Sequence, residues 1–169
     1  MRTLKIALLA TVATAALSSA TLAADLVIDA EPVIDNSFGF DWEGPYAGLW
    51  ISGQTTPGVF GLGADLGVNV LLDSSFLAGI EGDLAWLSDN SWQAQAHGKL
   101  GFVVDQAAIY GLAGFGWNSL SNGYVPLGIG AEFAVADNLT LKAEYQFQWD
   151  LDNAAQNSHV GKVGFNFHF

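Results

Sequence analysis

Ser158 and His159 are the residues of this chain that most resemble a hydrolytic pair. A serine nucleophile needs a histidine within hydrogen-bonding reach to accept its proton. The two residues are consecutive in a segment that is predicted to be a β-strand, and consecutive side chains of a strand point to opposite faces. The pair therefore cannot act together, and we expect no enzyme activity and no catalytic residue.

Metal and phosphate sites have no better support in the sequence. The three histidines, His97, His159 and His168, show none of the usual ligand spacings of a metal site. The chain has no cysteine, which excludes disulfides and thiolate ligands. The glycines of Gly61–Gly63 lie within a strand-like segment rather than before a helix, so they do not form a phosphate-binding loop. We expect no metal and no cofactor.

The first 23 residues differ in composition from the rest of the chain. Residues 1–23 have a basic start with Arg2 and Lys5, an apolar run from Ile6 to Leu17 and a small-residue exit. This three-part pattern predicts a secretory signal peptide, and the apolar run is shorter than the roughly 18 residues of a membrane-spanning helix. The whole chain carries 17 acidic and 5 basic residues, so no nucleic-acid partner is expected.

After the leader we expect an acidic, extended segment over residues 24–41 and a single domain over residues 42–169. The domain contains apolar segments of strand length, separated by clusters of Gly, Asp, Asn, Ser and Pro. They span residues 44–52, 59–71, 76–87, 91–104, 107–117, 124–135, 139–150 and 158–169. An even number of such strands predicts an all-β fold, an eight-stranded antiparallel up-and-down transmembrane β-barrel.

Most of the predicted strands have one polar and one apolar face. This alternation alone does not decide which face points outward. A soluble barrel that carries an apolar ligand would have its apolar row inside. All lysines beyond the leader lie on polar rows, and a lysine facing lipid at the midplane costs about 2 to 4 kcal/mol. We therefore place the polar rows inside, although strands 44–52 and 107–117 are apolar on both faces and remain unassigned. The predicted interior polar network consists of Glu81, Asp83, His97, Lys99, Glu132, Lys142, Glu144, Lys162 and His168.

Opposite charges in neighbouring strands can be paired by counting back from the turns. If Val135 pairs with Leu139, Glu132 lies directly across from Lys142. The same counting around residues 88–90 sets Glu81 across from His97. These pairs predict a closed interior, and the alternative is a water-filled lumen that would make the protein a narrow channel.

Aromatic residues gather at strand ends next to the connections over residues 53–58, 88–90, 118–123 and 151–157. Such a belt is typical of the membrane interface of a transmembrane barrel. The predicted girdle consists of Trp50, Trp86, Trp92, Trp117, Tyr124 and Trp149. The short connections at residues 105–106 and 136–138 are expected on the periplasmic side.

Three stretches carry a resemblance to a known family: Trp42–Gly48, Gly128–Tyr145 and Val160–Phe167. They resemble the alphaproteobacterial porin-like outer-membrane β-barrel family, which is related in architecture to the membrane domain of outer membrane protein A. The resemblance implies surface-antigen and envelope-stabilising roles, and in some members haem binding or pore activity. It also implies insertion by the barrel assembly machinery, with an assembly signal at Lys162, Gly164, Phe167 and Phe169. The connections between the strands of this chain are short for the family. Because ligand binding generally uses such loops, the resemblance gives less reason to expect haem binding or adhesion here.

The sequence as a whole predicts a structural protein of the bacterial outer membrane with a polar, plugged interior. Its expected partners are outer-membrane lipid, lipopolysaccharide and the barrel assembly machinery. The sequence does not decide whether the protein also forms a homo-oligomer. The alternatives are a narrow porin-like channel for small solutes or ions and a secreted soluble barrel. Eight strands enclose a space just wide enough for side chains to fill, which favours the structural protein over the channel.

Overall fold

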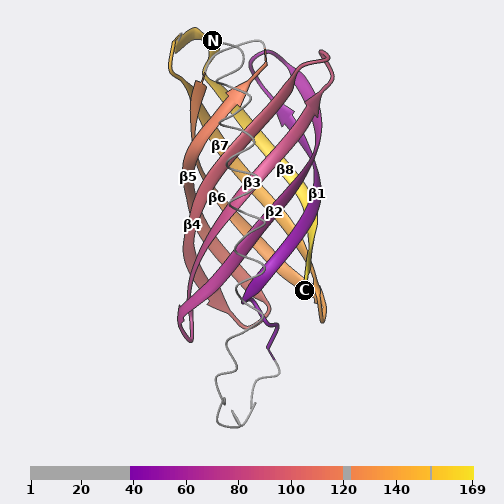
Figure 1. Ribbon diagram of the computed structural model, residues 1–169, viewed down its shortest axis with the longest axis vertical. Coiled ribbons are helices and arrows are strands. Elements are labelled where there is room, and N and C mark those ends of the chain that lie inside the picture. The colour runs from indigo at the N-terminus through magenta and orange to yellow at the C-terminus, as the bar shows by residue number, and fades with distance from the viewer. Residues whose placement is uncertain (1–38, 120–122, 153) are drawn as a thin grey trace, which may run out of the picture. The chain divides into compact units, whose positions relative to one another are not determined.

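The computed structural model describes residues 39–119, 123–152 and 154–169, so the predicted signal peptide lies outside the described residues. Eight antiparallel strands close into one barrel and follow one another around it in sequence order (Figure 1). The strands are β1 (Gly44–Gln54), β2 (Val59–Asp73), β3 (Phe76–Leu87), β4 (Trp92–Val104), β5 (Ala107–Asn118), β6 (Gly123–Ala136), β7 (Leu139–Asp150) and β8 (Ser158–His168). One 3-10 turn, η1 (Ala154–Gln156), precedes β8. Within the described ranges no helix has the length and hydropathy needed to cross a bilayer.

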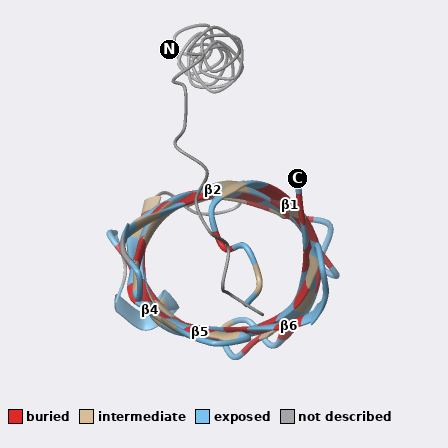
Figure 2. Ribbon diagram, turned by 90° about the horizontal axis from the view of Figure 1, so that it is seen from below, coloured by how far each residue is buried: buried red, intermediate tan, exposed pale blue. Residues whose placement is uncertain are grey.

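The barrel closes because β1 pairs with β8, from Tyr46 opposite His168 to Gln54 opposite Val160. Figure 2 shows the strands as one closed ring, with buried and exposed residues alternating along them. Closure leaves no sheet edge with unpaired backbone groups, which a structure in lipid requires. The predicted eight-stranded up-and-down barrel is confirmed.

The connections differ between the two ends of the barrel. At one end, which we call the turn end, the strands are joined by the two-residue turns 74–75, 105–106 and 137–138. At the other, which we call the loop end, the connections are longer, at residues 55–58, 88–91, 119–122 and 151–157. Strand boundaries lie within about two residues of those predicted, as is usual for element ends. The largest differences are at the ends of β1 and β2, which reach Gln54 and Asp73.

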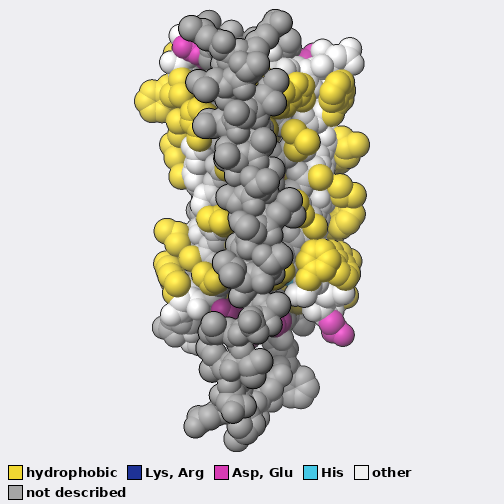
Figure 3. Space-filling view, viewed as in Figure 1, with side chains coloured by type: hydrophobic (Ala, Val, Ile, Leu, Met, Phe, Trp, Pro, Cys, Tyr) yellow, Lys and Arg dark blue, Asp and Glu magenta, His cyan; other side chains and the backbone are white. Residues whose placement is uncertain are grey.

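Apolar side chains face outward and polar ones face inward, as the positions of the lysines predict. On β2, for example, Leu66 is 68% exposed whereas the neighbouring Asp65 is 2% exposed. The strands left unassigned follow the same rule, since Ile51 and Ile109 are exposed while Ser52 and Tyr110 are buried. Figure 3 shows hydrophobic side chains over the visible outer face and carboxylates only near the two ends. This apolar band is suited to lipid, because a soluble barrel would bury it.

The predicted register of the charged pairs is confirmed, with one local exception. Glu132 lies opposite Lys142, and Glu81 lies opposite His97. The expected pairing of Val135 with Leu139 is wrong, because the register shifts between Ala134 and Ala136. This bulge places Ala136 opposite Leu139 and leaves the rest of the register unchanged.

Candidate functional site in the barrel interior

The centre of the barrel is filled by ion pairs that cross the lumen. The ammonium group of Lys99 lies 3.0 Å from Glu81 and 3.3 Å from Glu132. Lys142 contacts Asp65 and also lies 2.9 Å from the second carboxylate oxygen of Glu81. Glu81 is thus bound by two lysines from different strands, and a buried charge of this kind is stable only with such partners.

A second group of ion pairs lies around Asp83. Lys162 is 3.0 Å from one oxygen of Asp83 and 3.9 Å from Glu144. Gln95 donates a hydrogen bond of 2.9 Å to the other oxygen of Asp83. All of these side chains are buried, and ion contacts join the predicted polar residues of β3, β4, β6 and β7, together with Lys162 of β8, in one network. Asp65 on β2 also belongs to this network, although it was not among the predicted members.

Tyrosine side chains extend the network toward the barrel wall. The Tyr46 hydroxyl donates to Glu81 at 2.6 Å, and the Tyr110 hydroxyl donates to Glu144 at 2.8 Å. The ammonium group of Lys99 lies 4.6 Å from the Tyr46 ring centre and 4.7 Å from the Tyr110 ring centre. The ammonium group of Lys99 is therefore surrounded by carboxylates and aromatic faces. Both kinds of group stabilise its positive charge.

Glycines make room for these rings. Four inward rings each lie directly across from a glycine on a neighbouring strand, where an added side chain would collide with the ring. The pairs are Tyr46 with Gly67, Trp50 with Gly63, Tyr110 with Gly130 and Tyr124 with Gly116. The many glycines of the inner face thus determine where large rings fit inside a narrow barrel.

His97 lies between the carboxylates of Glu81 and Asp83, at 3.6 Å and 3.3 Å. These three residues have the ligand types and proximity of a metal site. The ammonium groups of Lys99, Lys142 and Lys162 already contact the same carboxylates, however, and they would repel a cation there. The trio is better explained as part of the ion network.

The turn end of the barrel is closed by aromatic side chains. Trp42 is buried with Leu77, Ala108 and Ala134, and its indole nitrogen donates to the backbone oxygen of Asp105 at 3.4 Å. The Phe40 ring packs edge-on against Trp42, with ring centres 4.8 Å apart. Sequence reasoning missed this closure, because Phe40 was assigned to the extended segment and no inward role was predicted for Trp42.

His168 belongs to this closure more than to the ion network. Its ring lies 4.9 Å from the Phe40 ring and stacks on Tyr46 at 5.2 Å. Its Nε2 atom is 3.9 Å from Glu132, a longer separation than those between the lysines and their main partners. His168 was correctly placed inside the barrel, but it connects the aromatic closure to the network.

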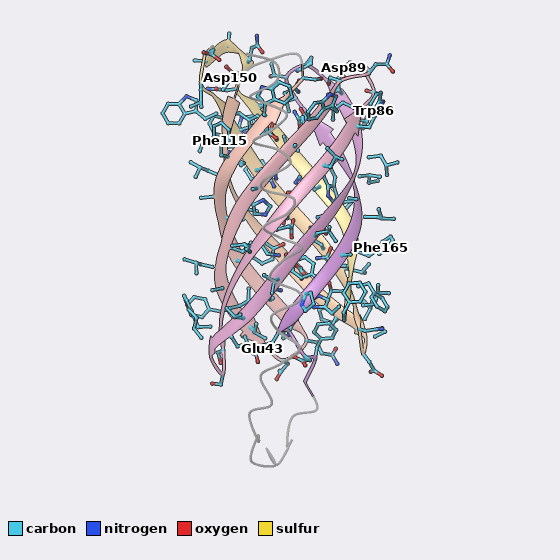
Figure 4. The ribbon with its side chains drawn as sticks, viewed as in Figure 1. Glu43, Trp86, Asp89, Phe115, Asp150 and Phe165 are labelled. Carbon is cyan, nitrogen blue, oxygen red and sulfur yellow. The ribbon has the colours of Figure 1, made fainter. Side chains whose placement is uncertain are left out.

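The predicted aromatic girdle is partly wrong. Trp86 and Trp149 are exposed at the loop end, and Trp92 packs edge-on against Trp117 with ring centres 4.8 Å apart. Figure 4 shows Trp86 near the loop end, together with Asp89, Phe115 and Asp150. Two of the expected members face inward instead, because they occupy inward positions of their strands. These are Trp50 and Tyr124, each 4% exposed.

The residues of the predicted assembly signal divide between the two faces of β8. Phe167 and Phe169 point outward, with ring centres 5.3 Å apart. Lys162 is buried in the ion network, and Gly164 lies against Trp50 of β1. Only the two phenylalanines are therefore accessible from the membrane side of the folded barrel.

The structure separates Ser158 from His159, as the strand pattern predicts. Ser158 is buried on the inner face, whereas His159 is exposed and its Nδ1 atom lies 2.6 Å from the Tyr145 hydroxyl. Within the described ranges we find no serine and histidine arranged as a nucleophile and its base.

Comparison with known proteins agrees with this geometry. Residues 93–169 match the family model described as the OmpA-like transmembrane domain. This match begins in β4 and includes every later strand. No curated protein sequence matches the chain significantly.

Solved structures of similar fold are membrane barrels. The N-terminal β-barrel domain of Pseudomonas aeruginosa OprF has a TM-score of 0.57 at 12% identity, covering 74% of this chain and 96% of that domain. Ail, the attachment invasion locus protein of Yersinia pestis, has a TM-score of 0.51 at 16% identity, covering 74% of this chain and 96% of Ail. The outer membrane enzyme PagL has a TM-score of 0.56 at 11% identity, covering 73% of this chain and 99% of PagL. At these identities the likeness shows the fold alone.

The outward apolar band, the closed ring of strands and the match over residues 93–169 lead to one conclusion. The protein is an eight-stranded β-barrel of the bacterial outer membrane whose C-terminal part is similar to the OmpA-like transmembrane domain.

Proposed function

We propose that this protein is a structural barrel of the outer membrane that contributes to envelope integrity and exposes its loop end at the cell surface. The observation that carries the proposal is the closure of the lumen. Lys99, Lys142 and Lys162 bind carboxylates across the centre of the barrel, and Trp42 is buried in an apolar cluster at the turn end. A barrel filled in this way is suited to a passive role in the membrane rather than to transport.

The proposed partners follow from the outer surface. The apolar band would contact outer-membrane lipid, and the exposed Trp86 and Trp149 would lie at the level of the lipopolysaccharide head groups. The exposed Phe167 and Phe169 would be available to the barrel assembly machinery. We propose no catalytic activity, because the lysines and carboxylates of the interior bind one another and Ser158 faces away from His159.

The competing proposal is a narrow channel, and planar bilayers distinguish the two. The purified, folded protein should give no stable conductance, with a 16-stranded porin as the positive control. A steady and reproducible ion current would overturn the proposal of a closed barrel and favour the channel.

A deletion strain tests the structural role itself. Loss of the protein should increase sensitivity to detergents and to large antibiotics that an intact outer membrane excludes, and the wild-type gene should restore resistance. Unchanged resistance in the deletion strain would contradict a role in envelope integrity.

A further inference from the structure

The loop end of the barrel contains an open cavity of about 240 Å³. Strand ends form its wall and connections between strands form its rim, so the cavity opens away from the apolar band. Figure 4 shows Asp89 and Asp150, which both line it, at this end of the barrel. We call this cavity the loop-end cup.

The cup has a floor made of two amide side chains. Gln54 and Gln93 bond to each other, with the Gln54 amide donating at 2.9 Å and the Gln93 amide donating at 3.4 Å. Beneath them is a void of about 10 Å³, next to Lys162 and Asp83 of the ion network. A cavity that ends on such a floor is suited to holding a ligand rather than passing one through.

The cup also has an amide in its wall. Gln148 lines the cavity, and only 5% of its surface is exposed, so its amide can be reached only from the cup. The amide of Gln148 is therefore positioned to bond with whatever occupies the cup.

The charge of the lining limits what that occupant can be. Asp89 and Asp150 contribute carboxylates, and neither lysine nor arginine is among the described residues of the lining. Anions are therefore disfavoured. Asp89 accepts hydrogen bonds from Ser91 on one carboxylate oxygen, and Asp150 accepts one from the backbone of Asp152. A carboxylate can accept several hydrogen bonds, so Asp89 can also accept from the hydroxyl groups of a neutral ligand.

We propose that the loop-end cup binds a single neutral hexose ring, either free or at the end of a glycan. A hydroxyl group both donates and accepts hydrogen bonds, as the amides of Gln54, Gln93 and Gln148 do. Leu87 and Pro57 add apolar surface to the lining for the C–H groups of the ring. The volume is below that of typical sites for drug-sized ligands, which favours a ligand of one ring.

The proposal is tested by NMR of the folded barrel in a detergent without sugar head groups, such as a phosphocholine. Glucose, galactose or mannose is added while the side-chain amide signals of glutamine are followed. The signals of Gln54, Gln93 and Gln148 should shift in a saturable way with at least one of these hexoses. Glucose 6-phosphate should bind more weakly than glucose, because its phosphate meets the acidic rim.

Two variants make the test specific. Gln148→Leu should weaken binding about tenfold, the effect expected for loss of one hydrogen bond. Gln106→Leu is the matched control, because Gln106 is exposed in a turn at the opposite end, and this change should leave affinity unchanged. Comparing a free hexose with a short oligosaccharide that ends in the same hexose distinguishes the two sources of the ring.

Three outcomes would overturn the proposal. The first is no saturable shift with any neutral hexose. The second is that glucosamine or calcium shifts these amide signals and the neutral hexoses do not, which would make the cup a cation site. The third is an equal shift of the Gln106 amide, which would reveal a general effect of concentrated sugar on the solvent.

Discussion

The ring of Tyr46 occupies the space in front of Gly67, the residue directly across from it on β2. The same ring places its hydroxyl against Glu81, so one glycine supports both the packing and the position of a buried charge. A methyl group at Gly67 would have to displace the Tyr46 ring, and Tyr46 would then lose its bond to Glu81.

Gly67→Ala should therefore destabilise the barrel by about 1 to 3 kcal/mol, the usual cost of overpacking a filled interior. Gly161→Ala is the control, because nothing lies within 4 Å of a methyl group added at Gly161. Unfolding by denaturant in lipid vesicles measures both effects. Equal stability of the two variants would show that the Tyr46 ring can move at no cost.

Lys142→Met should destabilise the barrel by about 3 to 5 kcal/mol, because it leaves buried carboxylates without a partner. Adding Asp65→Asn should recover part of this loss, since Lys142 contacts Asp65 directly. Adding Glu132→Gln should recover less, because Glu132 is bound by Lys99 even though it lies opposite Lys142 in the sheet. A double-mutant cycle measures the two couplings. A larger coupling to Glu132 would contradict the contacts across the lumen.

Phe169→Asp should lower the amount of protein inserted in the outer membrane of cells. Phe169 lies beyond the end of β8, at the turn end, and its side chain is 75% exposed. A charge near the end of a membrane barrel costs little, so the substitution should act mainly on recognition. Refolding of purified protein into vesicles without assembly proteins should therefore be nearly unchanged, and Phe169→Tyr should insert normally. Wild-type insertion of Phe169→Asp in cells would rule out a role for Phe169 in assembly.

The loop end should face the outside of the cell and the turn end the periplasm. An epitope inserted between Asp89 and Asn90 should be detected by antibody on intact cells. An epitope inserted at Gln106 should be detected only after the outer membrane is permeabilised. The opposite labelling pattern would reverse the assigned orientation.

The pKa of Asp89 should rise toward its ordinary value in Ser91→Ala. The Ser91 hydroxyl and backbone amide hold this pKa below its usual range, because both donate hydrogen bonds to the carboxylate. A lowered pKa means that the stability from these bonds is present above the ordinary pKa of Asp and is lost as the pH falls through the lowered value. Carbon-detected NMR titration measures the change. Ser88→Ala is the control, because the Ser88 hydroxyl accepts from Phe60 instead.

The sequence allowed most of the architecture to be predicted, because period-two alternation specifies both the strands and their faces. Counting back from short turns also gave the register of Glu132 with Lys142, even though a bulge at Ala134–Ala136 altered the turn itself. The partners across the lumen could not be found in this way. Lys142 binds Asp65, which lies far along the chain, and such contacts depend on how the strands are staggered around the whole barrel.

The two errors in the aromatic girdle have a common origin. Trp50 and Tyr124 were assigned by their position near strand ends, without regard to which face they occupy. Tyr124 shares the inward face of β6 with Glu132, so its orientation could have been found in the sequence. Trp50 lies on a strand that is apolar on both faces, and only its packing against Gly63 and Gly164 reveals its direction.

The burial of the three lysines of the barrel has a consequence for proteolysis. Beyond residue 5, the only lysines or arginines in the chain are Lys99, Lys142 and Lys162, and all three are enclosed by the strands. Trypsin cuts only after these residue types and needs an extended, accessible backbone. The described residues of the folded barrel therefore offer trypsin no accessible site, whereas a barrel that has failed to close can be cut after these three lysines into fragments of defined size.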